Sequence, residues 1–155
     1  MTFVAISALK WRHAGQACIT ANRIYVQRGV YEDFIKIMSE TGTKLKVGHG
    51  ADPTTTMGPL TMERGVEKAL ALVEDAQKNG ARILTGGKKL DLNGGYFFEP
   101  TVVADAHDDL LLAKEEQFAP IAALFPFDTE EEAVQKANNT SVRFWQSNDG
   151  SLLLT

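Results

Sequence analysis

The sequence contains one cysteine, Cys18, in the stretch HAGQACITANR from His13 to Arg23. A lone thiol can be an inert core side chain, because free cysteines usually only pack. It can also be a nucleophile, because its small neighbours leave room for a substrate and for a backbone N–H. A thiolate that attacks a carbonyl creates an oxyanion, which such N–H groups stabilise. The residue types leave both interpretations open.

A nucleophilic cysteine also requires a base, and the spacing of the histidines indicates none. His13 is five residues from Cys18, and His49 and His107 are remote in sequence. No Ser/His/Asp order or Cys/His spacing stands out. The residues alone therefore do not complete a catalytic group.

A second cluster of chemical interest is acidic. Asp105, Asp109 and Glu116 occupy positions 1, 5 and 12 of an EF-hand loop. Position 3 is His107, a poor calcium ligand, and position 6 is Leu110, where the sharp turn needs glycine. The residues at positions 3 and 6 argue against calcium binding, and no metal site is expected.

Composition and charge exclude several classes of partner. The net charge is −4 with Lys and Arg scattered along the chain, whereas a nucleic-acid surface needs a basic stripe. No apolar run approaches the ~20 residues of a membrane span. A single cysteine rules out an internal disulfide and fits a reducing compartment. We expect one soluble, cytoplasmic domain without nucleic-acid or membrane partners.

The elements that must position these residues are predicted from periodicity. Apolar residues at helical spacing predict helices over residues 3–12, 30–45, 61–80 and 128–137. Alternating or β-branched stretches predict strands over residues 23–27, 81–87, 96–103 and 121–127. The last two strands each contain a proline, which suggests an edge or an end. Because strands and helices alternate, the fold class is predicted to be α/β.

Details of the helix ends are also predicted. Lys10 and Arg12 are expected as cations that favour the end of the first helix. Thr61 is the expected N-cap of the third helix, and Asp128 with Glu131 is the expected capping box of the fourth. The buried face of the third helix is expected to comprise Val66, Ala69, Leu70, Val73 and Ala76.

Four stretches occur in an order that carries a family resemblance. They are WRHAGQACITANRIYVQ (11–27), VGHGADPTTTMGPL (47–60), GGYFFEPTVV (94–103) and KEEQFAP (114–120). The first resembles the catalytic-cysteine segment of the aldehyde dehydrogenase superfamily. The others resemble that family's glycine-rich loop with a Gly-Pro-Leu helix start, its aromatic strand and its Glu-Glu-x-Phe-Gly-Pro motif. The resemblance covers residues 4 to 142.

This resemblance implies a fold, an activity and a cofactor. The fold would be part of the family's catalytic domain, a mainly parallel sheet flanked by helices. Cys18 matches the nucleophile, which would form a thiohemiacetal with a small-molecule aldehyde and, after hydride loss, a thioester. The implied cofactor is NAD or NADP, and full-length members of the family are homo-oligomers. A mitochondrial location is the alternative to the cytoplasm.

The resemblance also assigns binding residues by position. Glu116 matches the glutamate that holds the nicotinamide ribose, because one carboxylate can accept hydrogen bonds from both hydroxyls of a diol. Phe118 matches a residue near the nicotinamide, and Ala119 replaces the usual glycine, which leaves the backbone less free to approach the cofactor. Arg12 resembles the succinate-semialdehyde branch, in which an arginine six residues before the cysteine grips the substrate's far carboxylate. From the residues alone, Glu116 belongs to a solvated acidic pair and Arg12 is a helix-end cation.

The family also has parts that do not match this sequence. Its nucleotide-binding domain, general-base glutamate and oxyanion-hole asparagine precede the cysteine segment. After Val142 the sequence RFWQSNDGSLLLT departs from the family pattern. We expect residues 1–142 to be a partial catalytic domain, residues 143–155 to be a divergent tail, and the isolated chain to be inactive. The alternative is a non-catalytic remnant that associates with a full-length relative.

Overall fold

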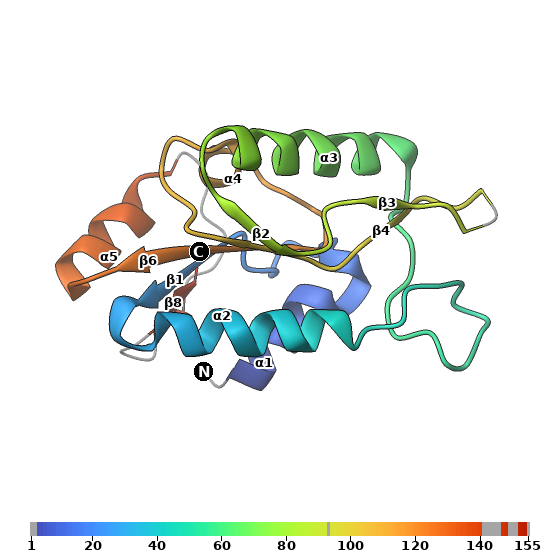
Figure 1. Cartoon of the computed structure of the whole chain (residues 1–155), viewed down its shortest axis with the longest axis horizontal. Coiled ribbons are helices and arrows are strands. Elements are labelled where there is room, and N and C mark those ends of the chain that lie inside the picture. The colour runs from blue at the N-terminus through green and yellow to red at the C-terminus, as the bar shows by residue number, and fades with distance from the viewer. Residues whose placement is uncertain (1–2, 93, 141–146, 149–151, 155) are drawn as a thin grey trace.

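The computed structural model describes residues 3–92, 94–140, 147–148 and 152–154 (Figure 1). The tail predicted to diverge, residues 143–155, lies partly outside these ranges. Within the described ranges, no helix combines the length and the apolar character that crossing a membrane requires.

A six-stranded sheet forms the centre of the molecule, in the order β2-β5-β6-β1-β8-β7. Its strands are β1 (Arg23–Gln27), β2 (Arg82–Thr85), β5 (Thr101–Ala104), β6 (Ile121–Phe127), β7 (Ser147–Asn148) and β8 (Leu152–Leu154). Strand β6 pairs in parallel with both β5 and β1, and antiparallel strands flank these three. The prediction of an α/β fold with parallel central strands is confirmed.

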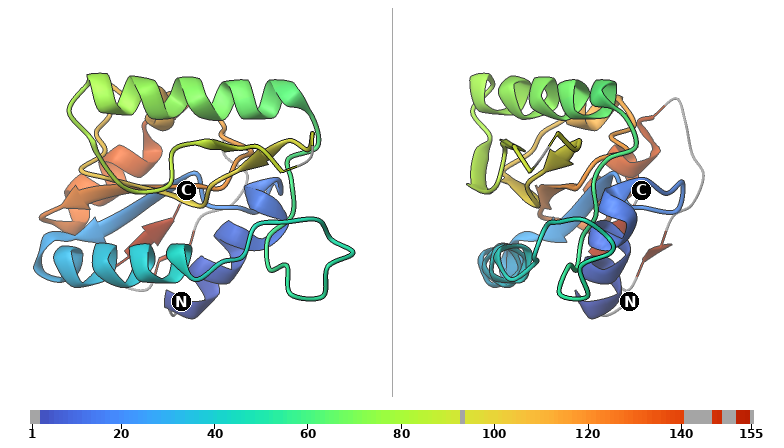
Figure 2. Two further views of the ribbon diagram at one scale, coloured as in Figure 1. Left: turned by 45° about the vertical axis from the view of Figure 1, so that its right-hand side comes forward. Right: turned by 90° about the vertical axis from the view of Figure 1, so that its right-hand side faces the viewer.

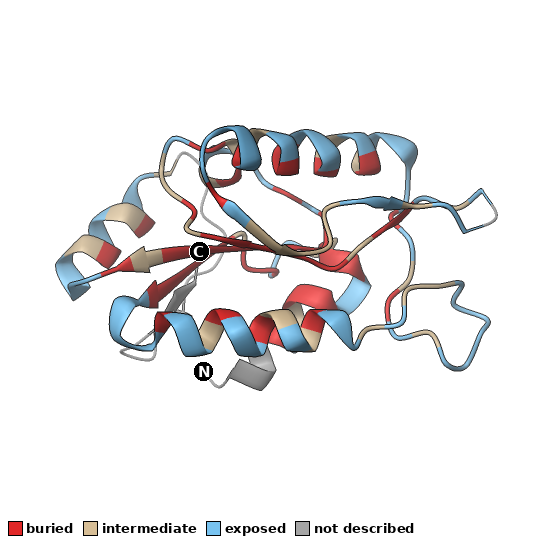
Figure 3. Ribbon diagram, viewed as in Figure 1, coloured by how far each residue is buried: buried red, intermediate tan, exposed pale blue. Residues whose placement is uncertain are grey.

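Helices cover both faces of this sheet (Figures 1 and 2). They are α1 (Phe3–Trp11), α2 (Arg28–Thr43), α3 (Glu63–Lys78), the short α4 (Leu111–Lys114) and α5 (Glu130–Asn138). Successive residues of a strand point to opposite faces. Ile24 and Val26 accordingly pack with residues of α1 and α2, whereas Tyr25 packs with residues of α3, α4 and α5. Figure 3 shows the buried residues of α2 and α3 on the helix faces turned toward the sheet.

The predicted strand over residues 96–103 is wrong in one respect, because the structure divides it. Phe97–Phe98 form β4, which pairs with β3 (Lys89–Leu90) in a separate two-stranded sheet, and the residues from Thr101 onward enter the main sheet as β5. Pro100 lies at the break, where its missing N–H interrupts no ladder. The other strand proline, Pro126, lies beyond the residues of β6 that pair with β5, so the expectation of a strand end is confirmed.

Two predicted helix starts are each one residue off. Met62 is the N-cap of α3, and Thr61, one residue earlier, donates its N–H to the side chain of Gln16. Thr129 is the N-cap of α5, and its Oγ1 accepts the N–H of Glu132 at 3.3 Å.

The predicted buried face of α3 also needs one correction. Leu72 is buried in place of Leu70, which is exposed on the opposite side of the helix. The other four positions of that face are buried as predicted.

Candidate active site

The loop that carries Cys18 joins α1 to β1 and begins with an unusual turn. The chain leaves α1 through the short helix η1 (Arg12–Gly15), in which His13, Ala14 and Gly15 have φ angles of 53°, 52° and 71°. For the two residues other than glycine, this left-handed conformation costs about 1–2 kcal/mol each. Such strain persists only where the surrounding structure fixes it, and it concentrates at functional sites.

Cys18 lies in the tight turn that follows. The N–H of Thr20 donates to the carbonyl of Ala17 at 2.9 Å and closes the turn. The Cys18 side chain is exposed, which excludes the interpretation as a buried packing residue. Within the described residues, the Cys18 N–H donates to no backbone acceptor.

Gly15 brings this loop against the KEEQFAP segment. A Cβ atom at Gly15 would collide with the carbonyl oxygen of Ala119 and lie 2.7 Å from its carbonyl carbon. Only glycine permits this approach, and it also tolerates the positive φ. The backbones of the cysteine loop and the KEEQFAP segment therefore lie in direct contact.

Gln16 connects the loop to the Gly-Pro-Leu stretch. Its Oε1 accepts the N–H of Thr61 at 2.9 Å, and its Nε2 donates to the carbonyls of His13 and Pro59 at 3.0 and 3.3 Å. Two backbone hydrogen bonds make the other connections. The N–H of Leu60 donates to the carbonyl of Tyr96, and the N–H of Thr101 donates to the carbonyl of Pro120. All four stretches that carry the family resemblance are thus hydrogen-bonded to one another.

A buried lysine completes these connections. Lys10 Nζ donates to the carbonyl of Ala21 at 3.0 Å and to Gln117 Oε1 at 3.1 Å. Gln117 in turn donates its backbone N–H to Asn22 Oδ1 at 3.2 Å and its Nε2 to the carbonyl of Asn22 at 2.6 Å. Burial lowers the pKa of Lys10 to about 7.

The predicted binding residues lie on these connected segments. Glu116 and Phe118 are exposed on either side of the buried Gln117, and Phe118 has a strained φ of 43°. Arg12 is exposed at the start of η1, and in the described part of the chain it forms no ion pair. The structure therefore brings the segments of Cys18, Glu116 and Phe118 together and places Arg12 before the left-handed turn.

Sequence reasoning missed Lys10, Gly15, Gln16, Asn22 and Gln117, which hold these segments together. One signal was available for Lys10, since it is flanked by Leu9 and Trp11 in an otherwise apolar helix. The glutamines carried no signal, because their partners are distant in sequence. No group of three His, Cys, Asp or Glu side chains suited to a metal ion occurs among the described residues.

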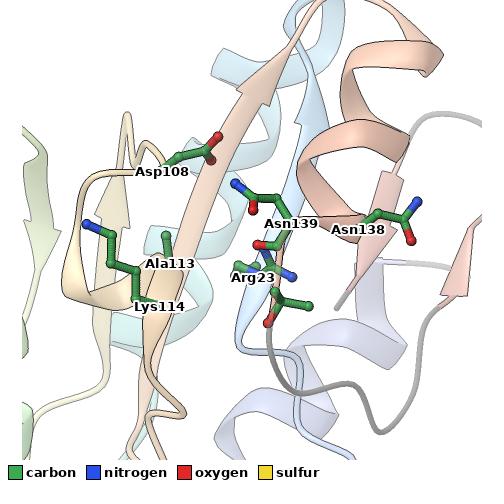
Figure 4. Close-up of a pocket in the computed structure, with 7 residues that line it drawn as sticks. Arg23, Asp108, Ala113, Lys114, Asn138 and Asn139 are labelled. Atoms are coloured by element: carbon green, nitrogen blue, oxygen red, sulfur yellow. The ribbon is translucent and has the colours of Figure 1, made fainter.

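A pocket of about 370 Å³ lies elsewhere, at the end of α5 (Figure 4). Its buried Arg23 donates to the carbonyls of Lys136, Ala137 and Asn139, all in the last turn of that helix or just after it. A cation at this position stabilises the helix dipole. These contacts give Arg23 a structural role in anchoring α5 to β1.

The chain is similar to known enzymes over most of its length. The sequence model described as "Aldehyde dehydrogenase family" matches residues 2–146. The chain is 44% identical over 138 residues to the NADP(+) succinate-semialdehyde dehydrogenase 1 of Schizosaccharomyces pombe, covering 89% of this chain and 28% of that protein. It is 46% identical over 134 residues to the mitochondrial succinate-semialdehyde dehydrogenase of Oryza sativa, covering 86% of this chain and 25% of that protein. The chain thus spans about a quarter of the length of these curated relatives.

Solved structures give the same result for the fold. The aldehyde dehydrogenase of Brucella melitensis biovar abortus 2308 superimposes with a TM-score of 0.85 at 47% identity. The succinate-semialdehyde dehydrogenase of Burkholderia pseudomallei superimposes with a TM-score of 0.86 at 43% identity. Each match covers 89% of this chain and 28% of the solved chain.

Proposed function

Because this chain belongs to the aldehyde dehydrogenase family, we propose that its thiol serves the NAD- or NADP-dependent oxidation of an aldehyde to the carboxylic acid. One observation carries the proposal: Cys18 is exposed on a strained loop that contacts the KEEQFAP segment. An exposed thiol on a loop that begins with strained residues suits a nucleophile better than a packing residue.

The chemistry proposed for Cys18 has two covalent stages. The thiolate adds to the aldehyde carbon, a C–S bond forms, and the carbonyl electron pair moves to oxygen. The Cys18 N–H, which has no backbone acceptor among the described residues, is proposed as a group that would stabilise that oxyanion. The nicotinamide cofactor supplies the hydride acceptor when bound. With that acceptor present, a hydride would leave the thiohemiacetal carbon while the oxygen electron pair re-forms the carbonyl, and a thioester would remain on Cys18. Water would then add to the thioester carbon and the C–S bond would break, which would release the acid and restore the thiol.

The KEEQFAP segment fits a nicotinamide cofactor. The exposed carboxylate of Glu116 has the acceptor capacity for two ribose hydroxyls. The neighbouring Phe118 offers an exposed apolar ring to the flat face of the nicotinamide. We assign the cofactor as NAD or NADP, in keeping with the S. pombe relative named for NADP(+).

The proposed aldehyde is succinate semialdehyde, which carries a carboxylate at its far end. Relatives named for this substrate support the proposal. In this chain Arg12 is an exposed guanidinium six residues before Cys18, and a guanidinium binds a carboxylate through two parallel hydrogen bonds. Arg12 is therefore proposed as the substrate-binding residue.

We further propose that residues 1–142 are a partial catalytic domain, followed by a divergent tail over residues 143–155. The family's base lies upstream of the cysteine segment, so the 155-residue chain alone is proposed to be inactive in aldehyde oxidation. The proposed location is the cytoplasm or the mitochondrion, and the proposed assembly of the full enzyme is a homo-oligomer. A non-catalytic remnant associated with a full-length relative is the alternative.

Acylation of Cys18 tests the assignment without requiring turnover. Two nitrophenyl esters, one with a distal carboxylate and one neutral, would be compared for their rate of acyl transfer to the Cys18 thiol. We expect the carboxylate ester to react about two- to fivefold faster, the range of an exposed ion pair. The preference should disappear in Arg12→Gln, and Cys18→Ala should show no acylation by mass spectrometry.

Equal rates for the two esters would remove the assignment of Arg12. Acylation at other nucleophiles with Cys18 unmodified would remove the proposed function itself.

A further inference from the structure

Lys10 is a buried cation whose observed partners are uncharged. It is 1% exposed in the last turn of α1. In the described chain, its Nζ donates to a backbone carbonyl and to an amide oxygen, and neither acceptor carries a charge. Burying an ammonium without a countercharge costs free energy. The free-energy cost of burying the Lys10 ammonium in the last turn of α1 needs an explanation beyond packing.

The positions of its two partners supply that explanation. Ala21 follows Cys18 by three residues, and Gln117 lies between Glu116 and Phe118. The Nζ atom thus reaches both segments that the proposed reaction uses. Asn22 closes the ring by accepting the backbone N–H and the side-chain N–H of Gln117.

We propose that Lys10 is a positioning residue, which fixes the cysteine loop against the Glu116–Phe118 segment by holding Ala21 and Gln117 with one nitrogen atom. The proposal rests on the proposed function for what the two segments bind, while the mechanical link between them stands independently of it. Catalytic groups need placement to well below 1 Å, because small displacements cost large factors in rate.

On the two linked segments, the side chains of charged or titratable type in the described chain are Arg12, His13, Cys18 and Arg23 on the loop side and Lys114, Glu115 and Glu116 on the facing side. Burial alone lowers the pKa of Lys10. An open loop would expose Lys10 to water and restore its ordinary pKa. The closed state is therefore favoured increasingly as pH rises from about 7 toward 10.5.

Hydrogen exchange measured by mass spectrometry on the whole chain tests the link. In Lys10→Met, the deuterium exchange rate should rise about two- to tenfold in peptides 12–22 and 111–120, the loss expected for a hydrogen bond between uncharged groups. Uptake in α3 (Glu63–Lys78) serves as the internal reference and should stay unchanged. The matched control is Lys36→Met, which alters an exposed lysine of α2.

A second variant and a pH profile separate positioning from general stability. Gln117→Leu removes the acceptor at the other end and should give the same local increase in uptake. In the unmodified chain, uptake of the two peptides relative to α3, corrected for intrinsic exchange, should fall between pH 7 and pH 9, and Lys10→Met should abolish this slope. Equal increases in α3, or no local increase in either variant, would overturn the proposal. If Cys18 stays unacylated by the esters while both variants still raise exchange in the two peptides, the proposed function is contradicted and the link made by Lys10 is not.

Discussion

Burial lowers the pKa of Lys10 to about 7 in the folded chain, because it removes water from the ammonium. In the unfolded chain its pKa is the ordinary 10.5. Between these values the unfolded state binds more protons than the folded state, so the free energy of unfolding rises with pH. We expect a rise of at most about 1.4 kcal/mol per pH unit in urea titrations between pH 7 and 9.

Lys10→Met should flatten that profile, while Lys36→Met should leave it intact. A flat profile in the unmodified chain would mean that Lys10 has water access in solution. The urea titrations should stop below pH 10. Burial raises the pKa of Tyr25 to about 12, so the contribution of Tyr25 to the free energy of unfolding falls as pH rises beyond about 10.

Gly15 offers a second residue-scale prediction. Gly15→Ala forces a side chain into a left-handed backbone and against the carbonyl group of Ala119. The sum of conformational strain and overpacking is about 2–5 kcal/mol of lost stability. Gly29→Ala is the control, since open space surrounds it in α2 and a helical alanine should stabilise by about 0.5–1 kcal/mol. Comparable midpoints for the two variants in thermal melts would contradict the close approach of the two backbones.

At this scale the sequence identified Cys18 but could not choose between its two roles. Exposure decided against packing, and exposure depends on the turn that Thr20 closes. The sequence likewise placed Lys10 as a cation near the end of a helix, and the structure in addition buries it and bonds it to Gln117 of the KEEQFAP segment. That segment lies 107 residues away from Lys10, so no local pattern contains the contact.

Among the elements, α2 is tied to the sheet through one hydroxyl. Tyr31 donates to the carbonyl of Leu124 in β6 at 3.2 Å and accepts the N–H of Asp105, which follows β5, at 2.6 Å. Tyr31→Phe removes the acceptor of the part-buried Asp105 N–H, whereas the Leu124 carbonyl keeps the N–H of Ala106 as a donor. We expect a loss of about 1–3 kcal/mol in the free energy of unfolding.

The control for this element is Tyr96→Phe, which removes a hydroxyl from a partly exposed ring. It should change stability by less than about 0.5 kcal/mol, as surface substitutions usually do. Chemical denaturation of the two variants side by side gives the comparison. An equally small change in the free energy of unfolding for Tyr31→Phe would show that the Tyr31 hydroxyl contributes little to holding α2 on the sheet.

The existence and type of most elements followed from periodicity, and α2 shows why. Tyr31, Ile35 and Met38 repeat at helical spacing and are all buried. The errors fall where a distant partner overrides local preference. Thr61 lies one residue before the N-cap of α3 and donates its N–H to the distant Gln16. Residues 96–103 divide because β4 and β5 pair with different strands. The four-residue helix α4 is too short to show a period.

For the whole molecule, exposed apolar side chains near the proposed site are the notable surface feature. Ile19, Met62 and Phe118 are 48%, 56% and 43% exposed, on three segments that hydrogen bonds or backbone contacts connect. Such side chains favour association when several lie close together. We expect the isolated chain to self-associate at micromolar concentration in gel filtration, with a melt of low cooperativity.

The matched variant Ile19→Ser with Met62→Ser should shift the elution toward the monomer without lowering the melting midpoint. A clean monomer with a sharp transition above ~60 °C would show instead that the chain is a self-sufficient domain.

The pairing of β1 with β6 sets the order of events during biosynthesis. Arg23 pairs with Ala123, so 100 residues separate two strands that are neighbours at the centre of the sheet. Closing so long a loop costs entropy before any contact compensates for it, and contacts of such large sequence separation slow folding. A nascent chain that has already displayed the cysteine loop must keep β1 unpaired until β6 has been translated. During that interval Ile24, Tyr25 and Val26, which are buried in the folded chain, remain exposed. Exposed strand residues of this kind make an incompletely folded chain prone to aggregation.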